Sequence, residues 1–166
     1  MSARSAPLPI FVHGMWRTGS TYIWNKFREQ PGYRAYLEPF HESLLRDKEE
    51  DLRRQLPPET AQTSRHPVLS DYYFSEYEIE PVGGIRHFEK RFSYQSYCLG
   101  PRSSDPPQLR YIRNLIEAAW RGQQRPVFKF TRGLMRAGWL QANFPSYTIL
   151  LLRRPLDIWK SFVSFG

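Results

Sequence analysis

The chain has 166 residues, of which 40% are hydrophobic and 16% aromatic, and it carries a formal net charge of +8 with a pI near 9.8. This composition excludes a disordered chain and predicts a single domain over residues 1–166. The charge predicts an anionic partner. Because the basic residues are spread along the chain, a pocket or a broad basic face is favoured over a nucleic-acid-binding tail.

The single cysteine, Cys98, excludes an internal disulfide framework and a multi-cysteine zinc site. The apolar run "LPIFV", residues 8–12, is too short for a signal sequence or a membrane span. We therefore expect a cytoplasmic protein with no membrane span.

The first predicted unit is a strand, a loop and a helix. The strand covers residues 9–12 and ends near Gly14, and a helix with apolar residues at helical spacing begins at Ser20 and stops before Pro31 and Gly32. This order, with a loop between the strand and the helix, is typical of an α/β unit.

The region after this helix is less regular. Pro39 biases Glu38 toward an extended backbone and places "EPFH", residues 38–41, at the end of a short strand or in a loop, with a second helix near His41. The charged residues 46–67, broken by two prolines, predict an exposed helix followed by a loop. Residues 68–80 have no clean period, so an irregular lid and a short helix both remain open. Trp16 and the aromatic residues at 72–77 are interpreted as packing residues.

The second half of the chain alternates between strands and helices. Residues 100–107 predict a loop, and residues 109–120 predict a helix with one apolar face and Gly122 just past its end. Residues 125–131 and 147–152 predict buried strands, with a short helix at 138–144 between them and another helix after Pro155. The alternation predicts an α/β domain of three layers, in which helices cover both faces of a mostly parallel sheet.

The stretch "HGMWRTGST", residues 13–21, resembles a phosphate-binding loop. The spacing GxxxxGK[ST] is met at Gly14, Gly19 and Thr21, but Ser20 takes the place of the lysine. Backbone N–H groups at the start of the helix and the hydroxyls of Thr18, Ser20 and Thr21 would hold a phosphate or sulfate group. Taken alone, this loop supports only an anion bound at a helix N-terminus, and a P-loop nucleotide kinase with a degenerate loop fits it equally well.

A second anion-binding loop is predicted where the strand at 147–152 ends. Arg153 follows this strand directly, and Ser161 comes eight residues later in the next helix. In a Mg²⁺-dependent nucleotide enzyme an aspartate usually ends such a strand. An arginine there would instead bind an anion directly. Because parallel strands end at one edge of a sheet, both loops are expected at that edge.

Together, "MWRTGSTYIWNKF" and "LLRRPLDIWKSFVSF" resemble the 5′-phosphosulfate loop and the 3′-phosphate motif of sulfotransferases that use 3′-phosphoadenosine 5′-phosphosulfate (PAPS), of the carbohydrate or bacterial type. The resemblance implies a P-loop NTPase-like sulfotransferase fold, PAPS as co-substrate and no metal. It implies transfer of a sulfuryl group to a hydroxyl, or less favourably an amine, of a carbohydrate or small-molecule acceptor. The donor would be held by Arg17, Thr18, Gly19, Ser20, Thr21, Arg153 and Ser161.

The resemblance also implies catalytic roles. Arg17 would contact the phosphosulfate, and Lys129 in "VFKFTR" matches a lysine that stabilises the transferring group in cytosolic relatives. Those relatives have a histidine base two residues later, where this chain has Thr131. Glu38, in the acid–proline pair, is the first candidate for the base, and His41 is the second. The simpler interpretations are an edge-strand lysine, a helix-capping glutamate and a surface or capping histidine.

Members of this family are usually longer, so the resemblance implies that the C-terminal part of the donor pocket lies outside this chain. An apolar edge exposed after "FVSFG", residues 162–166, would then favour association or poor solubility, and an oligomer is compatible with the sequence. Two other functions stay open. One is the nucleotide kinase, and the other is a non-catalytic basic module that binds an anion or nucleic acid.

Overall fold

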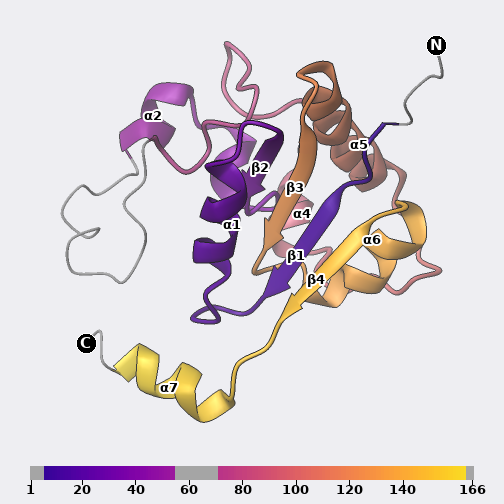
Figure 1. Ribbon diagram of the computed structural model, residues 1–166. Coiled ribbons are helices and arrows are strands. Elements are labelled where there is room, and N and C mark those ends of the chain that lie inside the picture. Colours follow the sequence, from indigo (N-terminus) through magenta and orange to yellow (C-terminus); the bar gives the residue numbers. More distant parts are fainter. Residues whose placement is uncertain (1–5, 55–70, 164–166) are drawn as a thin grey trace.

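A computed structural model describes residues 6–54 and 71–163 of the chain (Figure 1). Its sheet has four parallel strands in the order β2-β3-β1-β4. The strand bounds are β1 (Ile10–Gly14), β2 (Tyr33–Leu37), β3 (Arg125–Phe130) and β4 (Tyr147–Leu151). The predicted α/β class is confirmed. Because the strands are parallel, all four end at one edge of the sheet, the lower edge in Figure 1.

One face of the sheet is covered by α1 (Ser20–Arg28). Trp24 of this helix is fully buried against alternate residues of β1, β2 and β3, and its indole Nε1 donates a 2.6 Å hydrogen bond to the backbone oxygen of Ala35. This bond satisfies the indole N–H inside the core, so burial of the large ring carries no polar cost. The strand residues on this face are Ile10, Val12, Ala35, Leu37 and Val127.

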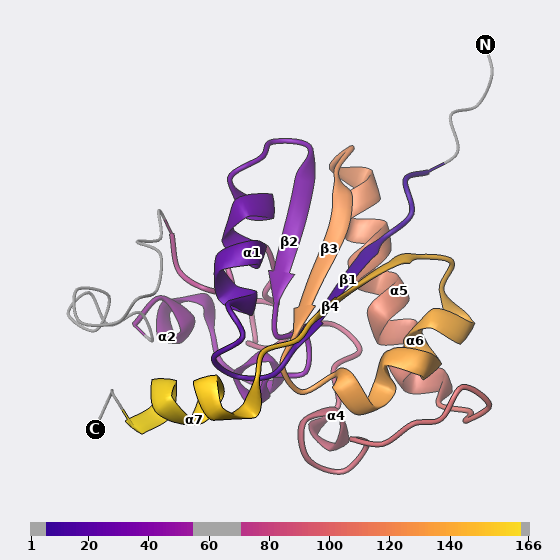
Figure 2. The ribbon, with the colours of Figure 1, turned by 60° about the horizontal axis from the view of Figure 1, so that its bottom comes forward.

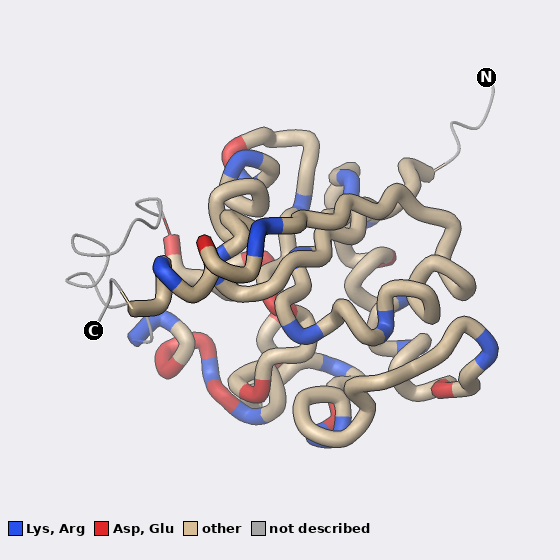
Figure 3. The backbone as a smooth tube through the Cα atoms, turned by 90° about the horizontal axis from the view of Figure 1, so that it is seen from below, with Lys and Arg blue, Asp and Glu red and all other residues tan. Residues whose placement is uncertain are grey.

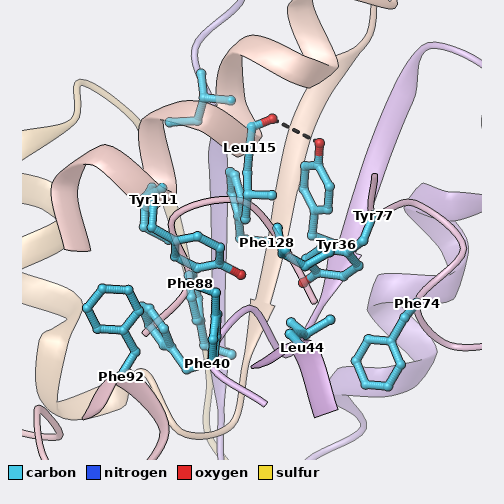
Figure 4. Close-up of a cluster of buried hydrophobic side chains, with 14 of the residues drawn as sticks. Tyr36, Phe40, Leu44, Phe74, Tyr77, Phe88, Phe92, Tyr111, Leu115 and Phe128 are labelled. Atoms are coloured by element: carbon cyan, nitrogen blue, oxygen red, sulfur yellow. Dashed lines mark hydrogen bonds between the residues drawn. The ribbon is translucent and has the colours of Figure 1, made fainter. Parts of the chain in front are cut away.

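The opposite face is covered by α5 (Pro106–Arg121) and α6 (Ala137–Asn143). Figure 4 shows Tyr36 and Phe128 from neighbouring strands packed beside Leu115 and Tyr111 of α5. The Tyr36 hydroxyl donates a 2.9 Å hydrogen bond to the backbone oxygen of Leu115, which satisfies the phenol inside the core. Since consecutive strand residues point to opposite faces, the same strands serve both cores. The predicted arrangement of helices on both faces is therefore confirmed.

The start of α5 corrects the loop prediction at 100–107. Asp105 is the N-cap and its carboxylate accepts a 3.2 Å hydrogen bond from the backbone N–H of Gln108, so Pro106 already belongs to the helix. Proline is tolerated there because the first helical N–H groups have no partner within the helix. The predicted end is confirmed, since Gly122 is the C-cap.

The irregular parts contain short helical segments. The helix expected near His41 is a single 3-10 turn, η1 (Glu42–Leu45), and the charged stretch forms α2 (Glu49–Arg54). Two segments were not predicted, α4 (Lys90–Tyr94) and η2 (Leu134–Arg136). The loop predicted up to residue 67 lies largely outside the described residues. For residues 68–80 the sequence left an irregular lid and a short helix open, and residues 68–70 of this segment are also outside the described part. Its described part, residues 71–80, consists of turns.

The last helix, α7 (Pro155–Val163), projects from the carboxyl end of β4 on the side of the molecule where α1 lies (Figures 1 and 2). Its apolar side chains are exposed: Leu156 by 62%, Trp159 by 66% and Val163 by 61%. β4, which leads into α7, is an edge strand of the described sheet and is itself half-exposed. The C-terminal segment up to Val163 therefore presents an apolar surface. The burial predicted for the strand at 147–152 is wrong, because β4 is an edge strand whose residues are exposed or partly exposed. The apolar edge predicted after "FVSFG" falls largely outside the described residues.

Two general properties bear on the function. Lys and Arg positions are distributed over the described chain and are not gathered on one element (Figure 3). Within the described residues, none of the helices combines the length and the apolar character needed to span a lipid bilayer. Because the positive charge is distributed, it does not by itself locate an anion-binding site, and the local geometry must be used instead.

Candidate anion-binding site

The loop between β1 and α1 is shaped by two glycines. A Cβ at Gly14 would lie 2.7 Å from Thr18 Oγ1, so a side chain there would collide with the loop. Gly19, the residue before α1, has a φ of +85°, which glycine adopts without strain. Thr18 Oγ1 donates a 2.7 Å hydrogen bond to the Met15 carbonyl and braces the turn. The first N–H groups of α1 are thereby presented at the sheet edge, as an anion site requires.

A pocket of about 380 Å³ lies at this helix N-terminus. It contains seven of the predicted site residues, although they come from three separate parts of the chain. Its lining consists of Trp16, Arg17, Gly19, Ser20, Thr21, Tyr22, Lys129, Thr131, Arg153, Ser161 and Phe162. Of the other predicted residues, Thr18 braces the loop, while Glu38 and His41 do not line the pocket.

Arg17 connects the two predicted anion-binding loops. Its Nε donates a 2.9 Å hydrogen bond to Ser161 Oγ, and its backbone oxygen accepts a 2.8 Å hydrogen bond from Arg153 Nη1. Arg17 has a φ of +65°, a left-handed conformation that is uncommon for a residue with a side chain. The two arginines and Ser161 therefore meet at one side of the pocket, as the spacing in the sequence predicts.

Lys129 reaches the pocket from β3. This strand lies between β2 and β1, and Lys129 is 5% exposed, so it is not a lysine on an exposed edge strand. It shares the α1 face of the sheet with Val127, because strand residues two apart point the same way. Its Nζ lies 2.5 Å from Glu38 Oε1 and 2.7 Å from Thr131 Oγ1. An ammonium group is thus held next to the pocket in a partly desolvated setting.

Glu38 lies directly behind Lys129, at the carboxyl end of β2. Both of its carboxylate oxygens are 3.0 Å from the backbone N of Thr131, and Oε1 also accepts from the Thr131 hydroxyl. The predicted extended backbone is wrong, since Glu38 has a φ of +45°. The physical reason is tertiary: the Glu38 N–H bonds to the Lys129 carbonyl at 2.9 Å, and its carboxylate is held by β3 and the residue after it.

The charge state of Glu38 follows from these contacts. Burial alone would raise its pKa, but the Lys129 ammonium and the hydrogen bonds from Lys129 and Thr131 outweigh burial and hold the pKa of Glu38 below its usual value. The carboxylate is therefore ionised at neutral pH and able to accept a proton. The same contacts lower its basicity, so a base role requires Lys129 to be drawn toward another anion during the reaction.

His41 has a different surrounding. It is the N-cap of η1, and its Nδ1 accepts a 3.2 Å hydrogen bond from the backbone N–H of Ser43. Its ring packs on Phe74 with the ring centres 5.4 Å apart, and burial lowers its pKa. This geometry matches the capping interpretation of the residue.

Sequence reasoning missed parts of the pocket. Trp16 was expected to pack, but it is 59% exposed and lines the pocket, whereas the predicted packing of Tyr72 and Tyr77 is confirmed. Tyr22 and Phe162 also line it. Two of these residues could have been found from their positions. Tyr22 lies in the first turn of α1, and Phe162 directly follows Ser161. Trp16 carries the same kind of signal, since it directly precedes Arg17.

No protein-family model, no curated protein and no solved structure matches the chain. The geometry of the pocket must therefore support any functional conclusion.

Proposed function

We propose that this protein is a sulfotransferase that binds PAPS in the pocket at the N-terminus of α1 and transfers its sulfuryl group to an acceptor hydroxyl in the cytoplasm. The observation that carries the proposal is the convergence of Arg17, Lys129, Arg153 and Ser161 on one pocket beside free helical N–H groups. Its volume of about 380 Å³ lies within the range of small-molecule sites.

Two groups of pocket residues suit the two anionic groups of PAPS. The N-terminus of α1, with Arg17 and the hydroxyls of Ser20 and Thr21, would hold the phosphosulfate. Arg153 and Ser161 would hold the 3′-phosphate, which ADP and ATP lack. The existing contacts of Arg17 with Ser161 and Arg153 support the proposal, because they hold both arginines at the same pocket.

The reaction needs a cationic group that stabilises the leaving oxygen and a base that accepts the proton of the acceptor hydroxyl. The acceptor oxygen would form a bond to sulfur while the bond between sulfur and the bridging oxygen breaks, and that oxygen leaves with 3′-phosphoadenosine 5′-phosphate (PAP). Lys129, at the pocket wall, would stabilise the charge that develops on the bridging oxygen. The acceptor proton would pass to Glu38, whose carboxylate is 2.5 Å from Lys129 Nζ.

The same residues support PAPS over a Mg²⁺–nucleotide substrate. Ser20 stands where a P-loop kinase has lysine, and β4 is followed by Arg153 in place of an acidic residue. The described residues that line the pocket include no carboxylate. A kinase commonly supplies an acid to help hold Mg²⁺ on the terminal phosphates.

Calorimetry with PAP, ADP and ATP tests the proposal. We expect PAP to bind at least 10-fold more tightly than ADP, because about 1.4 kcal/mol from the 3′-phosphate contacts corresponds to that factor. Arg153→Ala should abolish this preference and leave ADP binding nearly unchanged. The matched control is Arg154→Ala, since Arg154 is exposed and pairs with Asp157 at 2.8 Å.

Other outcomes separate the alternatives. Equal binding of PAP and ADP would overturn the sulfotransferase proposal. ATP binding that requires Mg²⁺ would instead support a kinase. A nucleic-acid-binding module would bind oligonucleotides with an affinity that falls steeply with salt and does not respond to Arg153→Ala.

A further inference from the structure

The two carboxylate oxygens of Glu38 have unequal surroundings. Oε1 accepts from Lys129 Nζ at 2.5 Å, from the Thr131 backbone N at 3.0 Å and from the Thr131 hydroxyl. Among the described residues, Oε2 accepts from the Thr131 N–H alone, at 3.0 Å. A carboxylate oxygen can accept at least two hydrogen bonds, so Oε2 retains a free lone pair while Oε1 is saturated.

The direction of the hydrogen bonds around Thr131 is determined by chemistry. Lys129 Nζ lies 2.7 Å from Thr131 Oγ1, and an ammonium group can only donate. The Thr131 hydroxyl therefore accepts from Lys129 and uses its single hydrogen to donate to Glu38 Oε1. Thr131 thus binds the carboxylate twice, by hydroxyl and by backbone N–H, while it also lines the pocket.

The backbone at Glu38 is held in an unfavourable conformation. A φ of +45° is uncommon for a residue with a side chain, and such a conformation persists where surrounding contacts impose it. Removing the contacts should allow Glu38 to relax. The contacts with Lys129 and Thr131, together with the bond from the Glu38 N–H to the Lys129 carbonyl, are the ones that hold it.

We propose that Thr131 is the positioning residue for Glu38, and that Glu38 Oε2 is the atom that receives the proton of the acceptor. The inference rests on the proposed sulfuryl transfer and specifies how its base is oriented. Lys129 and the Thr131 hydroxyl both bond Oε1, so among the described residues Oε2 has fewer partners than Oε1. The acceptor O–H bond then breaks toward Oε2 as the acceptor oxygen bonds to sulfur and PAP departs.

Thr131 variants test this arrangement. Thr131→Val keeps the shape and the backbone N–H but removes the hydroxyl, while Thr131→Ser keeps the hydroxyl. With water as the acceptor, we expect PAP release from PAPS to fall about 10- to 100-fold in Thr131→Val. Thr131→Ser should stay within about threefold of the unchanged protein, and PAP affinity by calorimetry should change less than about twofold in both. Thr131→Ala replaces the valine variant if that variant does not fold.

A pH profile distinguishes positioning from a merely structural role. The Thr131 hydroxyl bond lowers the pKa of Glu38, so its loss should move the acidic limb of the rate profile, and the Glu38 carboxyl titration by NMR, to higher pH. The other titratable or charged groups whose fields reach Glu38 are Lys129, His41, Tyr77 and Arg132, and these are unchanged in the variants.

The outcomes are distinct. A Thr131→Val protein with an unchanged rate, or an unchanged Glu38 titration, would overturn the positioning role. A Thr131→Ser protein as slow as Thr131→Val would overturn it as well. If the unchanged protein binds PAP but releases none from PAPS above the buffer rate, the proposed sulfuryl transfer itself fails, and with it this inference.

Discussion

Arg17 Nε donates a 2.9 Å hydrogen bond to Ser161 Oγ across 144 positions of sequence, and this bond joins the two loops that form the candidate site. Both residues line the pocket. Ser161 Oγ accepts this bond from Arg17, and it is also the atom that we propose to bind the 3′-phosphate. The contribution of the Ser161 hydroxyl to ligand affinity can be measured separately from that of the two arginines.

Ser161→Ala should weaken PAP binding by about 5- to 10-fold, because a hydrogen bond that involves a charged group contributes about 1–3 kcal/mol and part of it is replaced by water. ADP binding should change less than about twofold, so ADP serves as the control ligand within the same calorimetric experiment. An equal loss for both ligands would show that Ser161 supports the loop in general and does not contact the 3′-phosphate.

The ion pair between Arg91 and Asp105 gives a prediction on acid stability. Asp105 is buried and its carboxylate accepts from Arg91 Nη1 at 2.8 Å, from Arg91 Nη2 at 2.6 Å and from the N–H of Gln108 at 3.2 Å. Burial alone would raise the pKa of Asp105, but these hydrogen bonds outweigh it and lower the pKa. A lowered folded-state pKa stabilises the protein above the unfolded pKa of about 3.9, and this contribution is lost as the pH falls through the folded value.

Asp105→Asn keeps a capping oxygen but loses the charge. At pH 7 it should lower the free energy of unfolding by about 1–3 kcal/mol, measured by urea unfolding. The difference from the unchanged protein should shrink as the pH falls below about 3.9, the unfolded pKa, and through the lower folded pKa of Asp105, because the stabilisation that depends on its charge is then lost. Asp51→Asn is the control, since the Asp51 side chain is 52% exposed. A difference that stays constant between pH 7 and pH 3 would contradict the assigned cause.

The sequence predicted those parts of the site that lie directly after the ends of strands. Parallel strands end at one edge, so Arg17 and Arg153 were expected together although they are far apart in the chain. The hydrophobic pattern identified β1, β3 and β4 and the helices α1, α5, α6 and α7. Residues 33–37, which form β2, carry no continuous apolar run, and the sequence left a short strand and a loop open there.

The parts that could not be predicted depend on contacts between distant side chains. Local preference before Pro39 favours an extended Glu38, but bonds to residues 91 and 93 positions away impose a left-handed backbone. Thr131 could be identified only as the residue that replaces a histidine. Its hydrogen bonds to Glu38 exist only once β2 and β3 pair. Helix α4 has five residues, too few for a period to show.

Two tryptophans in helices give a final prediction on stability. Trp24 in α1 is fully buried and donates to the Ala35 carbonyl at 2.6 Å, whereas Trp159 in α7 is 66% exposed. Trp24→Phe removes the donor to the Ala35 carbonyl, so it should lower the free energy of unfolding by about 1–3 kcal/mol. Trp24→Ala should cost about 3–5 kcal/mol, because it also opens a cavity between α1 and the sheet.

Trp159→Phe and Trp159→Ala are the matched controls and should change the free energy of unfolding by less than about 0.5 kcal/mol in urea. Trp159 is exposed in a helix whose described side chains are not buried, so the ring has no packing to lose. The Trp159 variants should instead reduce the binding of an apolar dye to the native protein, since they remove part of an exposed apolar surface. A loss of stability at Trp159 as large as that at Trp24 would show that α7 packs against the domain in solution, and that its apolar face is not exposed as described.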